Sequence, residues 1–312
     1  MNLREFNEGK ATQMTMLNDC TARFLMCRPE HFAVSYTINP WMNPKRWARD
    51  AGAHAAAERE WTALHRKLVE LGAAVELVPP APGLPDLVFT ANAAVVLDRQ
   101  ALLARFRHPQ RQREEAHFEA AFRALQARGR IDAVRKLPDG LVLEGAGDCV
   151  WDEGRNLFWM GYGPRSDAVA AHAVADMFGR EVVALELADE RFYHMDTALA
   201  PLPGGEVMYL PSAFTAAGNA AIRERVAPHA CIEIAIEDGR RLAANAVGLG
   251  ETLIMSGCGQ RLRAELNERG YDVVTTPLPS FLRSGGSAFC LTLRLDRRSV
   301  PLFAVAQNPA VA

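Results

Sequence analysis

The sequence predicts a mixed α/β fold made of one repeated unit, in which two strands are followed by a helix and a further strand. Two observations support this prediction. Apolar runs that contain one small or polar residue recur along the chain, and amphipathic stretches followed by short β-branched runs lie between them. Such self-similarity is typical of supersecondary units that are stacked or arranged around an axis.

The repeat is measured between the polar residues that mark the apolar runs. By subtraction of residue numbers, successive markers are 53, 56, 48, 49 and 45 residues apart. A period of about 50 residues leaves room for one ββαβ unit in each interval. The markers are Asn39, Asn92, Asp148, Asp196, Asn245 and Cys290.

Helices are predicted where apolar residues recur at a spacing of three to four positions. These stretches cover residues 44–71, 111–128, 166–178, 213–226 and 260–268. Four of them lead into a glycine, which favours the left-handed conformation that ends many helices: Gly72, Gly129, Gly179 and Gly270. Ser166 is the residue type expected to cap the third helix. Short β-branched runs at 74–78, 181–185 and 271–274 are predicted as strands.

Residues 192–197, Phe-Tyr-His-Met-Asp-Thr, are also predicted as a strand. On a strand, residues two positions apart share a face, so His194 and Asp196 would point into one cavity while Tyr193 and Met195 face away. A titratable base beside an anion suits a site that moves protons around a cationic substrate.

Domain organisation follows from the absence of any long stretch rich in proline, glycine and serine that would serve as an interdomain linker. We therefore predict a single catalytic domain over residues 21–312. The polar residues 1–20 are predicted to form a flexible N-terminal arm.

Composition restricts the classes of partner. The 35 basic and 37 acidic residues nearly balance, which argues against nucleic acid or an anionic membrane as the main partner. The chain has no secretory signal and no apolar run of transmembrane length, so we expect a cytoplasmic location. The six scattered cysteines form no CxxC pair and no zinc pattern, and we expect reduced thiols. The expected partner is a small-molecule substrate, and a homo-oligomer remains possible.

Three residues are candidates for chemistry from their local context. Cys290 follows a Gly-Gly-Ser turn, where glycines allow close approach of the backbone to a ligand, and it is the candidate nucleophile. Glu144 comes after an apolar run and before two glycines; a carboxylate there is expected to be buried with a partner such as an imidazolium. The Gly-Ala-Gly after it lacks a third glycine and a following helix, which disfavours a nucleotide loop. Arg165 suits the bidentate binding of a carboxylate.

Six motifs taken in order resemble the guanidine-modifying superfamily, or penteins, over residues 28–293. This superfamily includes arginine deiminase, dimethylarginine dimethylaminohydrolase, the amidinotransferases and arginine dihydrolase. The resemblance implies a fivefold pseudosymmetric α/β propeller, in agreement with the period. The motifs are Ile-Asn-Pro-Trp-Met at 38–42, Pro-Asp-Leu-Val-Phe-Thr-Ala-Asn at 85–92, Glu-Gly-Ala-Gly-Asp at 144–148, Gly-Tyr-Gly-Pro-Arg-Ser at 161–166, His-Met-Asp at 194–196, and Gly-Gly-Ser at 285–287 before Cys290.

The resemblance also implies a role for each catalytic residue. Cys290 would attack the guanidino carbon and form a thiouronium intermediate. His194 would act as general acid and base, and Glu144 would orient and charge it. Asp196 would bind the guanidino nitrogens, and Arg165 would hold the α-carboxylate of the substrate. No metal and no cofactor would be needed.

Three further residues would bind substrate or shape the site: Asn39, Asp86 and Asn92. Asn92 departs from the deiminase and dimethylarginine hydrolase pattern, which has aspartate there, whereas the dihydrolase branch has asparagine. An asparagine amide can donate to the oxygen of a ureido group. The favoured activity is therefore conversion of arginine to ornithine with release of ammonia and carbon dioxide. The alternatives are a dimethylarginine dimethylaminohydrolase, an arginine deiminase, an amidinotransferase, or a non-enzymatic binding protein of the same fold.

Overall fold

Five three-stranded sheets form the framework of the molecule in the computed structural model, which describes residues 21–299. In each sheet the central strand pairs antiparallel with one neighbour and parallel with the other. The sheets are β15 (Leu293–Arg294), β1 (Arg23–Cys27) and β2 (Ala74–Val78); β3 (Ala94–Leu97), β4 (Gln100–Leu103) and β5 (Ala133–Lys136); β6 (Cys149–Asp152), β7 (Leu157–Tyr162) and β8 (Glu181–Glu186); β9 (Leu199–Pro201), β10 (Val207–Tyr209) and β11 (Cys231–Glu233); and β12 (Val247–Leu249), β13 (Thr252–Met255) and β14 (Asp272–Thr275).

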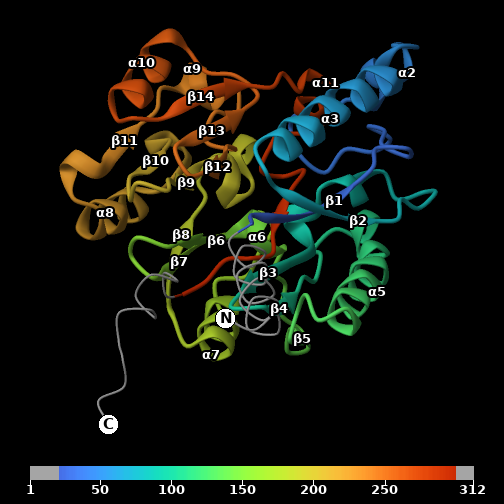
Figure 1. Cartoon of the computed structure of the whole chain (residues 1–312), viewed down its shortest axis with the longest axis horizontal. Helices are drawn as coiled ribbons and strands as arrows, with labels where there is room; N and C mark the ends of the chain where they lie inside the picture. The colour runs from blue at the N-terminus through green and yellow to red at the C-terminus, as the bar shows by residue number, and fades with distance from the viewer. Residues whose placement is uncertain (1–20, 300–312) are drawn as a thin grey trace, which may run out of the picture.

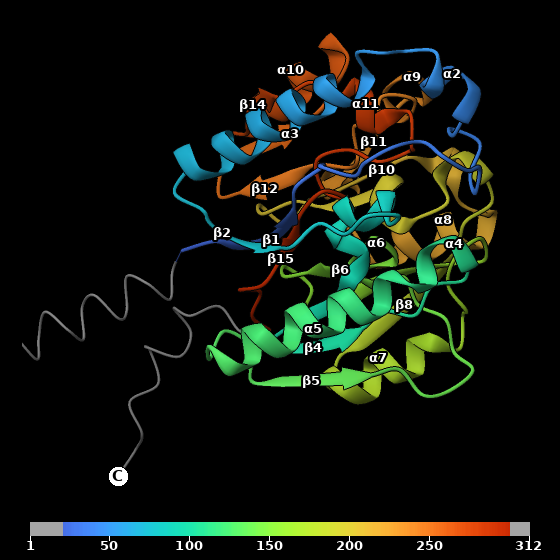
Figure 2. The ribbon, with the colours of Figure 1, turned by 90° about the vertical axis from the view of Figure 1, so that its right-hand side faces the viewer.

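Each parallel pair of strands is joined by a crossover helix, because parallel neighbours cannot be linked by a tight turn. Figure 1 shows these helices at the periphery, with the sheets directed inward. In the side view of Figure 2, α3 and α10 lie in the upper part of the molecule and α5 and α7 in the lower part. The crossover helices are α3 (Ala53–Glu70), α5 (Glu114–Ala127), α7 (Ala170–Phe178), α8 (Ala216–Arg225) and α10 (Gln260–Glu268).

The ring of sheets is closed by the two ends of the described chain. Strand β15 pairs with β1, with Phe24 opposite Arg294 and Leu25 opposite Leu293. The first unit therefore takes its first strand from the C-terminal side and its other two from the N-terminal side. The predicted fivefold arrangement of ββαβ units is confirmed, and the closure places Cys290, just before β15, near the centre of the ring.

The crossover helices bury the apolar stripes that predicted them. Helix α3 buries Trp61, Leu64 and Leu68 against its sheet, and α5 buries Phe118 and Phe122 in the same way. The glycines expected at helix ends are also observed. Gly179, for example, has φ 62° and follows α7, a conformation that is strained for residues with a Cβ.

Two predicted helices are each divided in two, and two others begin later than predicted, one of which is the helix predicted over 213–226, observed as α8. The helix predicted over 44–71 is α2 (Pro44–Ala48) and α3, and that over 111–128 is α4 (Pro109–Gln112) and α5. The break after α2 is stabilised locally, because the Asp50 side chain accepts from the Gly52 backbone. Helix α7 begins at Ala170, so Ser166 is not its cap.

The strand predicted over residues 192–197 was wrong. This segment contains two short 3-10 turns, η3 (Glu190–Phe192) and η4 (Met195–Thr197), with His194 between them. The turn is favoured because Thr197 Oγ1 donates to the His194 carbonyl at 2.7 Å. Other short helical turns are η1 (Pro85–Val88), η2 (Thr90–Ala93), η5 (Pro211–Ala213), η6 (Pro228–Ala230), α9 (Ile236–Gly239) and α11 (Pro279–Leu282). A further helical turn, α6 (Gly145–Asp148), follows Glu144, where no helix was expected.

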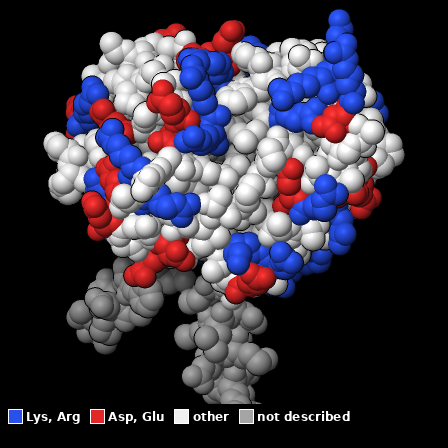
Figure 3. Space-filling view, turned by 90° about the horizontal axis from the view of Figure 1, so that it is seen from above, with Lys and Arg blue, Asp and Glu red and all other residues white. Residues whose placement is uncertain are grey.

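The surface drawn in Figure 3 carries basic and acidic side chains that are interspersed with each other. Among residues 21–299, no helix is both long and apolar enough to cross a bilayer. The predicted N-terminal arm, residues 1–20, lies outside the described residues. The assignment of residues 21–312 to a single domain stays a prediction.

Candidate active site

All eight predicted site residues come together at the centre of the ring, on one side of it. Six of them line one small cavity, here called the front pocket: Asn39, Asp86, Asn92, Arg165, His194 and Cys290. The other two contact this group directly. Glu144 accepts from His194, and Asp196 lies against the Cys290 sulfur. The turns that carry these residues come from widely separated parts of the described chain, and the ring arrangement of the units brings them together.

The Cys290 sulfur is held between an acceptor and a donor. Its Sγ lies 3.1 Å from Asp196 Oδ2, to which the thiol donates, and it accepts from Asn245 Nδ2 at 3.1 Å. Asn245 Oδ1 also accepts from the Cys290 backbone N–H at 3.1 Å. Burial and, next, the Asp196 carboxylate raise the pKa of Cys290 well above its ordinary value. The resting group is therefore a thiol, and a bound cation is needed to favour the thiolate.

The glycines before Cys290 allow other side chains to approach the backbone closely. A Cβ on Gly286 would lie 2.4 Å from the Phe89 ring, and one on Gly285 would lie 2.8 Å from Tyr193. Tyr193 donates its hydroxyl to the Gly285 carbonyl at 3.0 Å and lines the front pocket. The expectation that Tyr193 faces away from the site was therefore wrong, because the segment is a turn and not a strand.

His194 is oriented by a buried carboxylate. Its Nε2 lies 2.8 Å from Glu144 Oε2, and since an ionised carboxylate only accepts, this nitrogen carries the proton and Nδ1 is left as the basic nitrogen. Burial lowers the pKa of His194 to about 4, and Glu144 offsets only part of that effect. The resting imidazole is thus neutral, which differs from the expectation that Glu144 charges it.

The charge of Glu144 is balanced by Arg165. Arg165 Nη1 donates to Glu144 Oε2 at 2.9 Å, and both side chains are almost fully buried, with 2% and 0% exposed. Burial alone would raise the pKa of Glu144, but Arg165 and the His194 hydrogen bond outweigh it and hold the pKa well below its usual range. The Arg165 guanidinium also lies over the Tyr193 ring at 4.5 Å.

Two residues that sequence reasoning did not place in the site connect Glu144 to His194. Ser166 Oγ accepts from the Glu144 backbone N–H at 3.0 Å and donates to Asp148 Oδ2 at 2.5 Å. Asp148 Oδ1 in turn accepts from the Met195 backbone N–H at 3.2 Å. This chain of contacts fixes the segments that carry Glu144 and His194 relative to each other. Asp148 was recognised only as a marker of the repeat, and Ser166 only as a candidate cap.

Asn92 is oriented by a buried arginine that sequence reasoning also missed. Arg111 Nη1 donates to Asn92 Oδ1 at 2.9 Å, and Asn92 Nδ2 donates to the Glu144 carbonyl at 3.1 Å. Because the arginine only donates and the carbonyl only accepts, the amide has one orientation. Arg111 is paired with Glu114 at 2.8 Å, and both are buried. Their position in a strongly charged stretch gave no sign of this burial.

Asp86 and Asn39 complete the wall of the front pocket. Asp86 Oδ2 accepts from the Tyr36 hydroxyl at 2.7 Å, whereas its buried Oδ1 has no partner within the described residues. Burial raises the pKa of Asp86, against the effect of Arg111. Asn39 Nδ2 donates to the Ser284 carbonyl at 3.0 Å, which ties the segment before α2 to the turn before Cys290.

Residues 21–299 contain no group of three His, Cys, Asp or Glu side chains that could hold a metal ion.

Replacing Asp196 by asparagine is expected to make Cys290 more reactive in the absence of substrate. The Asp196 carboxylate raises the pKa of Cys290, so its removal lowers that pKa and increases the thiolate fraction at neutral pH. We expect iodoacetamide to alkylate Cys290 about tenfold faster at pH 7, measured by the mass of the Cys290 peptide. The half-buried Cys258 serves as the internal control. An unchanged or slower rate at Cys290 would contradict this account of its pKa.

A family model and several known proteins match most of this chain, and they agree with one another. The model of the family described as N,N dimethylarginine dimethylhydrolase, eukaryotic, matches residues 28–297. The N(G),N(G)-dimethylarginine dimethylaminohydrolase of Mycobacterium tuberculosis is 34% identical over 278 residues, which are 88% of this chain and 86% of that protein. The bifunctional arginine dihydrolase/ornithine cyclodeaminase of Synechocystis sp. is 42% identical over 279 residues, or 89% of this chain. The chain spans 38% of the length of that larger relative.

Solved structures extend the comparison to the fold. The N-terminal domain of the arginine dihydrolase of the cyanobacterial ornithine-ammonia cycle, bound to product, superposes with a TM-score of 0.84 at 41% identity, covering 90% of this chain and all of that domain. A variant of the same domain, with serine in place of an asparagine, is covalently bonded to a reaction intermediate. A dimethylarginine dimethylaminohydrolase superposes with a TM-score of 0.70 at 20% identity, covering 88% of this chain and 99% of that one, and therefore shares the fold.

Proposed function

We infer the function of this chain from the premise that it belongs to the N,N dimethylarginine dimethylhydrolase family. We propose that it hydrolyses the guanidino C–N bonds of arginine twice and yields ornithine, ammonia and carbon dioxide. The larger cyanobacterial relatives carry the name arginine dihydrolase, which supports arginine as the substrate. The arrangement around Asn92 favours two hydrolytic steps over one.

The first step uses the thiol and the imidazole that share the front pocket. The substrate guanidinium binds beside Asp196, and its positive charge favours the Cys290 thiolate. The sulfur attacks the guanidino carbon, the C–N bond breaks, and ammonia leaves with a proton supplied through His194. Water then adds to the thiouronium carbon, the S–C bond breaks, and the ureido product remains in the pocket.

The second step depends on how the site accommodates a neutral ureido oxygen. Asn92 Nδ2 carries two hydrogens, and only one of them is used by the Glu144 carbonyl. Arg111 fixes the amide orientation and Asn92 lines the front pocket, so we assign the second N–H to the ureido oxygen. This donor can hold the ureido oxygen, so the intermediate stays bound. Cys290 then attacks the ureido carbon, the second ammonia leaves, water adds to the carbon and the S–C bond breaks, and the resulting carbamate of ornithine releases carbon dioxide. The orientation of Asn92 is the single observation that carries the proposal.

Replacing Asn92 by aspartate is expected to shift the product from ornithine toward citrulline. One aspartate oxygen would pair with Arg111, but the other would face the Glu144 carbonyl and the ureido oxygen, and acceptors do not bond each other. An unsatisfied buried group costs on the order of 1–3 kcal/mol, so we expect about a tenfold change in the ornithine-to-citrulline ratio. Mass spectrometry of the products measures it. A ratio equal to that of the wild type would remove Asn92 from this role.

The charged end of the substrate is assigned to Arg165, with Asp86 as a partner for substrate N–H groups. The free Oδ1 of Asp86 is a buried acceptor, and burying an acceptor without a partner is costly. The Arg165 guanidinium donates one N–H to Glu144 and another to the Ile38 carbonyl, and its remaining N–H groups can reach a carboxylate. Arg165 therefore serves both substrate binding and the charge of Glu144.

Replacing Arg165 by alanine tests this double role. Loss of the counter-ion of Glu144 is expected to lower kcat for arginine and for agmatine, which lacks the carboxylate. Loss of the carboxylate contact should additionally reduce kcat/KM for arginine relative to agmatine by about tenfold. The measurement is the ratio of the two kcat/KM values in wild type and variant. If that ratio does not change, Arg165 acts only through Glu144.

The alternatives are separated by one set of incubations. Arginine, methylated arginines, agmatine and citrulline are each supplied to the wild-type protein, and the products are identified by mass spectrometry. A dimethylarginine dimethylaminohydrolase would act on the methylated substrates and leave arginine intact. Amidino transfer would give ornithine without ammonia, and a binding protein would give no product. We expect turnover of arginine to ornithine, and the absence of any reaction with arginine would overturn the proposal.

A further inference from the structure

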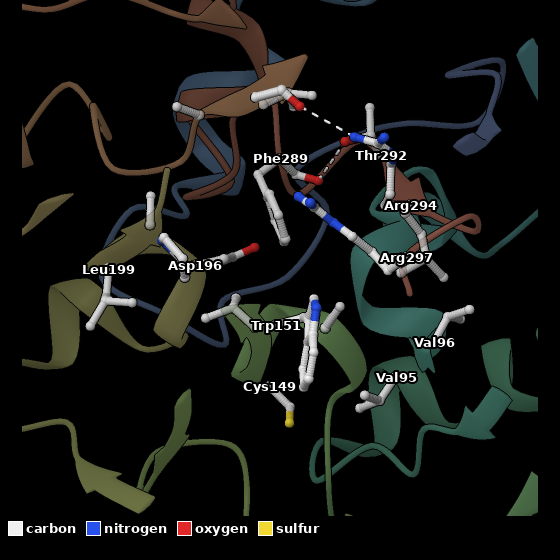
Figure 4. A pocket seen from close by; sticks show the side chains of 18 of the residues that line it. Val95, Val96, Cys149, Trp151, Asp196, Leu199, Phe289, Thr292, Arg294 and Arg297 are labelled. Atoms are coloured by element: carbon white, nitrogen blue, oxygen red, sulfur yellow. Dashed lines mark hydrogen bonds between the residues drawn. The ribbon is translucent and has the colours of Figure 1, made fainter. Parts of the chain in front are cut away.

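A second cavity lies on the pseudo-fivefold axis, on the other side of Asp196 from the front pocket. It is lined by residues of the first strand of every unit, β15, β3, β6, β9 and β12. Figure 4 shows these strands surrounding it, with Val95, Trp151 and Leu199 on different walls. We call it the axial cavity. Its position follows from the fold, because five sheets around one axis leave a space where their innermost strands meet.

Asp196 separates the axial cavity from the nucleophile. Its Oδ2 lies 3.1 Å from Cys290 Sγ, and the residue also lines the axial cavity. Figure 4 shows the carboxylate directed toward the middle of this cavity. The other oxygen, Oδ1, is buried and has no hydrogen-bond partner in the described chain. The nitrogen Nε1 of Trp151, which also lines this cavity, is likewise buried and unpartnered.

These two groups indicate what the cavity holds. An acceptor on Asp196 and a donor on Trp151 both require partners, because buried polar groups are rarely left unsatisfied. The axial cavity offers about 60 Å³ to the centres of water-sized molecules. By the same measure one water needs about 10–15 Å³, so the axial cavity has room for several small molecules.

The chemistry of the site makes such a space useful. Each conversion of arginine to ornithine consumes two water molecules and releases two ammonia molecules and one carbon dioxide. During this sequence the amino-acid part of the substrate fills the front pocket, and the ureido intermediate has to stay bound. Water and ammonia therefore need a second route to the carbon atom attached to Cys290.

We propose that the axial cavity is this route: it supplies water to the Cys290–Asp196 centre and lets ammonia and carbon dioxide leave while the amino acid occupies the front pocket. This inference rests on the proposed hydrolase function. In each cycle the Cys290 sulfur forms a bond to the carbon and a C–N bond breaks, with the proton of the leaving amine supplied through His194. A water from the axial side then adds to the carbon, the S–C bond breaks, and the sulfur regains a proton.

The outer rim of the axial cavity favours neutral molecules. Its partly exposed residues include Arg294 and Arg297. Arg294 is paired with Asp296 and Arg297 with Glu153, so the rim carries charge without being a free anion site. Because each guanidinium is paired with a carboxylate, the rim has no net charge that would attract ions, and the largely apolar lining of the cavity favours neutral water, ammonia and carbon dioxide.

The test narrows the axial cavity at small residues that take no part in the chemistry. Ala200 on β9 and Ala246 before β12 both line it, and each is replaced by valine and by leucine, with Ala200→Ser as the control of nearly unchanged size. We expect kcat for arginine to fall about tenfold in the leucine variants and less in the valine variants. The ratio kcat/KM should stay nearly unchanged, because the slowed step follows formation of the covalent intermediate. The valine variants keep the test valid if leucine prevents folding, since valine is favoured in strands.

Mass spectrometry of acid-quenched protein distinguishes blockage from general damage. A blocked passage slows the water-dependent step, so the fraction of Cys290 carrying the covalent intermediate rises above that of wild type. Misplacement of Cys290 or His194 would instead lower that fraction. The rate of Cys290 alkylation by iodoacetamide, which enters by the front pocket, should not change.

A folded leucine or valine variant with wild-type kcat and a wild-type level of covalent intermediate would overturn the proposal that the axial cavity is a passage. A fall in kcat together with a lower level of intermediate would also overturn it. The proposed function is tested separately by the products of the wild type. If the wild type proves to hydrolyse methylated arginine instead, the same variants and readouts apply to that substrate, because its hydrolysis also consumes water.

Discussion

Replacement of Cys290 by serine is expected to leave a folded protein that turns over arginine at least about 10³-fold more slowly than wild type. The serine hydroxyl can accept from Asn245 and donate to Asp196 as the thiol does, so the packing is retained. An alcohol, however, does not supply a comparable anion near neutral pH, even beside a bound guanidinium. Steady-state release of ammonia measures the loss, and circular dichroism checks the fold.

The matched control is Cys258→Ser, which changes a half-buried thiol outside the front pocket. We expect this variant to retain wild-type turnover. A second readout is the mass of the protein after incubation with arginine and an acid quench. The Cys290→Ser protein should show no added mass, because it forms no covalent intermediate. Turnover by that variant above a few per cent of the wild-type rate would rule out sulfur as the nucleophile.

Replacement of Glu144 by glutamine is expected to affect both activity and stability. The amide cannot neutralise Arg165, so a buried guanidinium loses its counter-ion, and breaking such a pair costs about 3–5 kcal/mol. His194 loses the carboxylate that fixes its tautomer, and general acid–base catalysis of this kind is worth about 10²–10⁴-fold in rate. We expect kcat to fall by that factor and the thermal midpoint of unfolding to fall as well.

Asp148→Asn is the matched control for Glu144→Gln. Asp148 is also buried, and its carboxylate lies 4.0 Å from His194, but burial raises the pKa of Asp148 well above its ordinary value. The neutral acid is thus favoured there, and an amide of the same shape replaces it at little electrostatic cost. We expect kcat within about tenfold of wild type. Equal losses in both variants would mean that the charge of Glu144 has no special role.

The sequence was sufficient for the architecture because the fold repeats. Five intervals of similar length, each with an apolar run and an amphipathic helix, are enough to predict ββαβ units, and the sheets confirm them. The pairing of β15 with β1 could not be predicted, because ring closure joins segments about 270 residues apart and leaves no local pattern. The gap between α2 and α3 was missed since periodicity alone does not detect a short break.

The site was predicted in part, and the omissions have physical causes. Residues with unusual chemistry in apolar context, such as Cys290 and Glu144, were recognisable. Arg111 was not, because its burial depends on Glu114 and Asn92 and a charged stretch normally indicates a solvated helix. Asn245 was seen only as a marker of the repeat, although it holds the Cys290 sulfur. The turn around His194 depends on Asp148, a distant residue, and its alternation resembled a strand.

The most direct test of two-step hydrolysis is a time course of the wild-type protein with arginine, in which ornithine, citrulline and ammonia are measured in the same samples. We predict two ammonia molecules for each ornithine from the earliest time points, without free citrulline, because the ureido intermediate stays bound beside Asn92. One ammonia for each citrulline, with citrulline as the sole amino-acid product, would contradict the account.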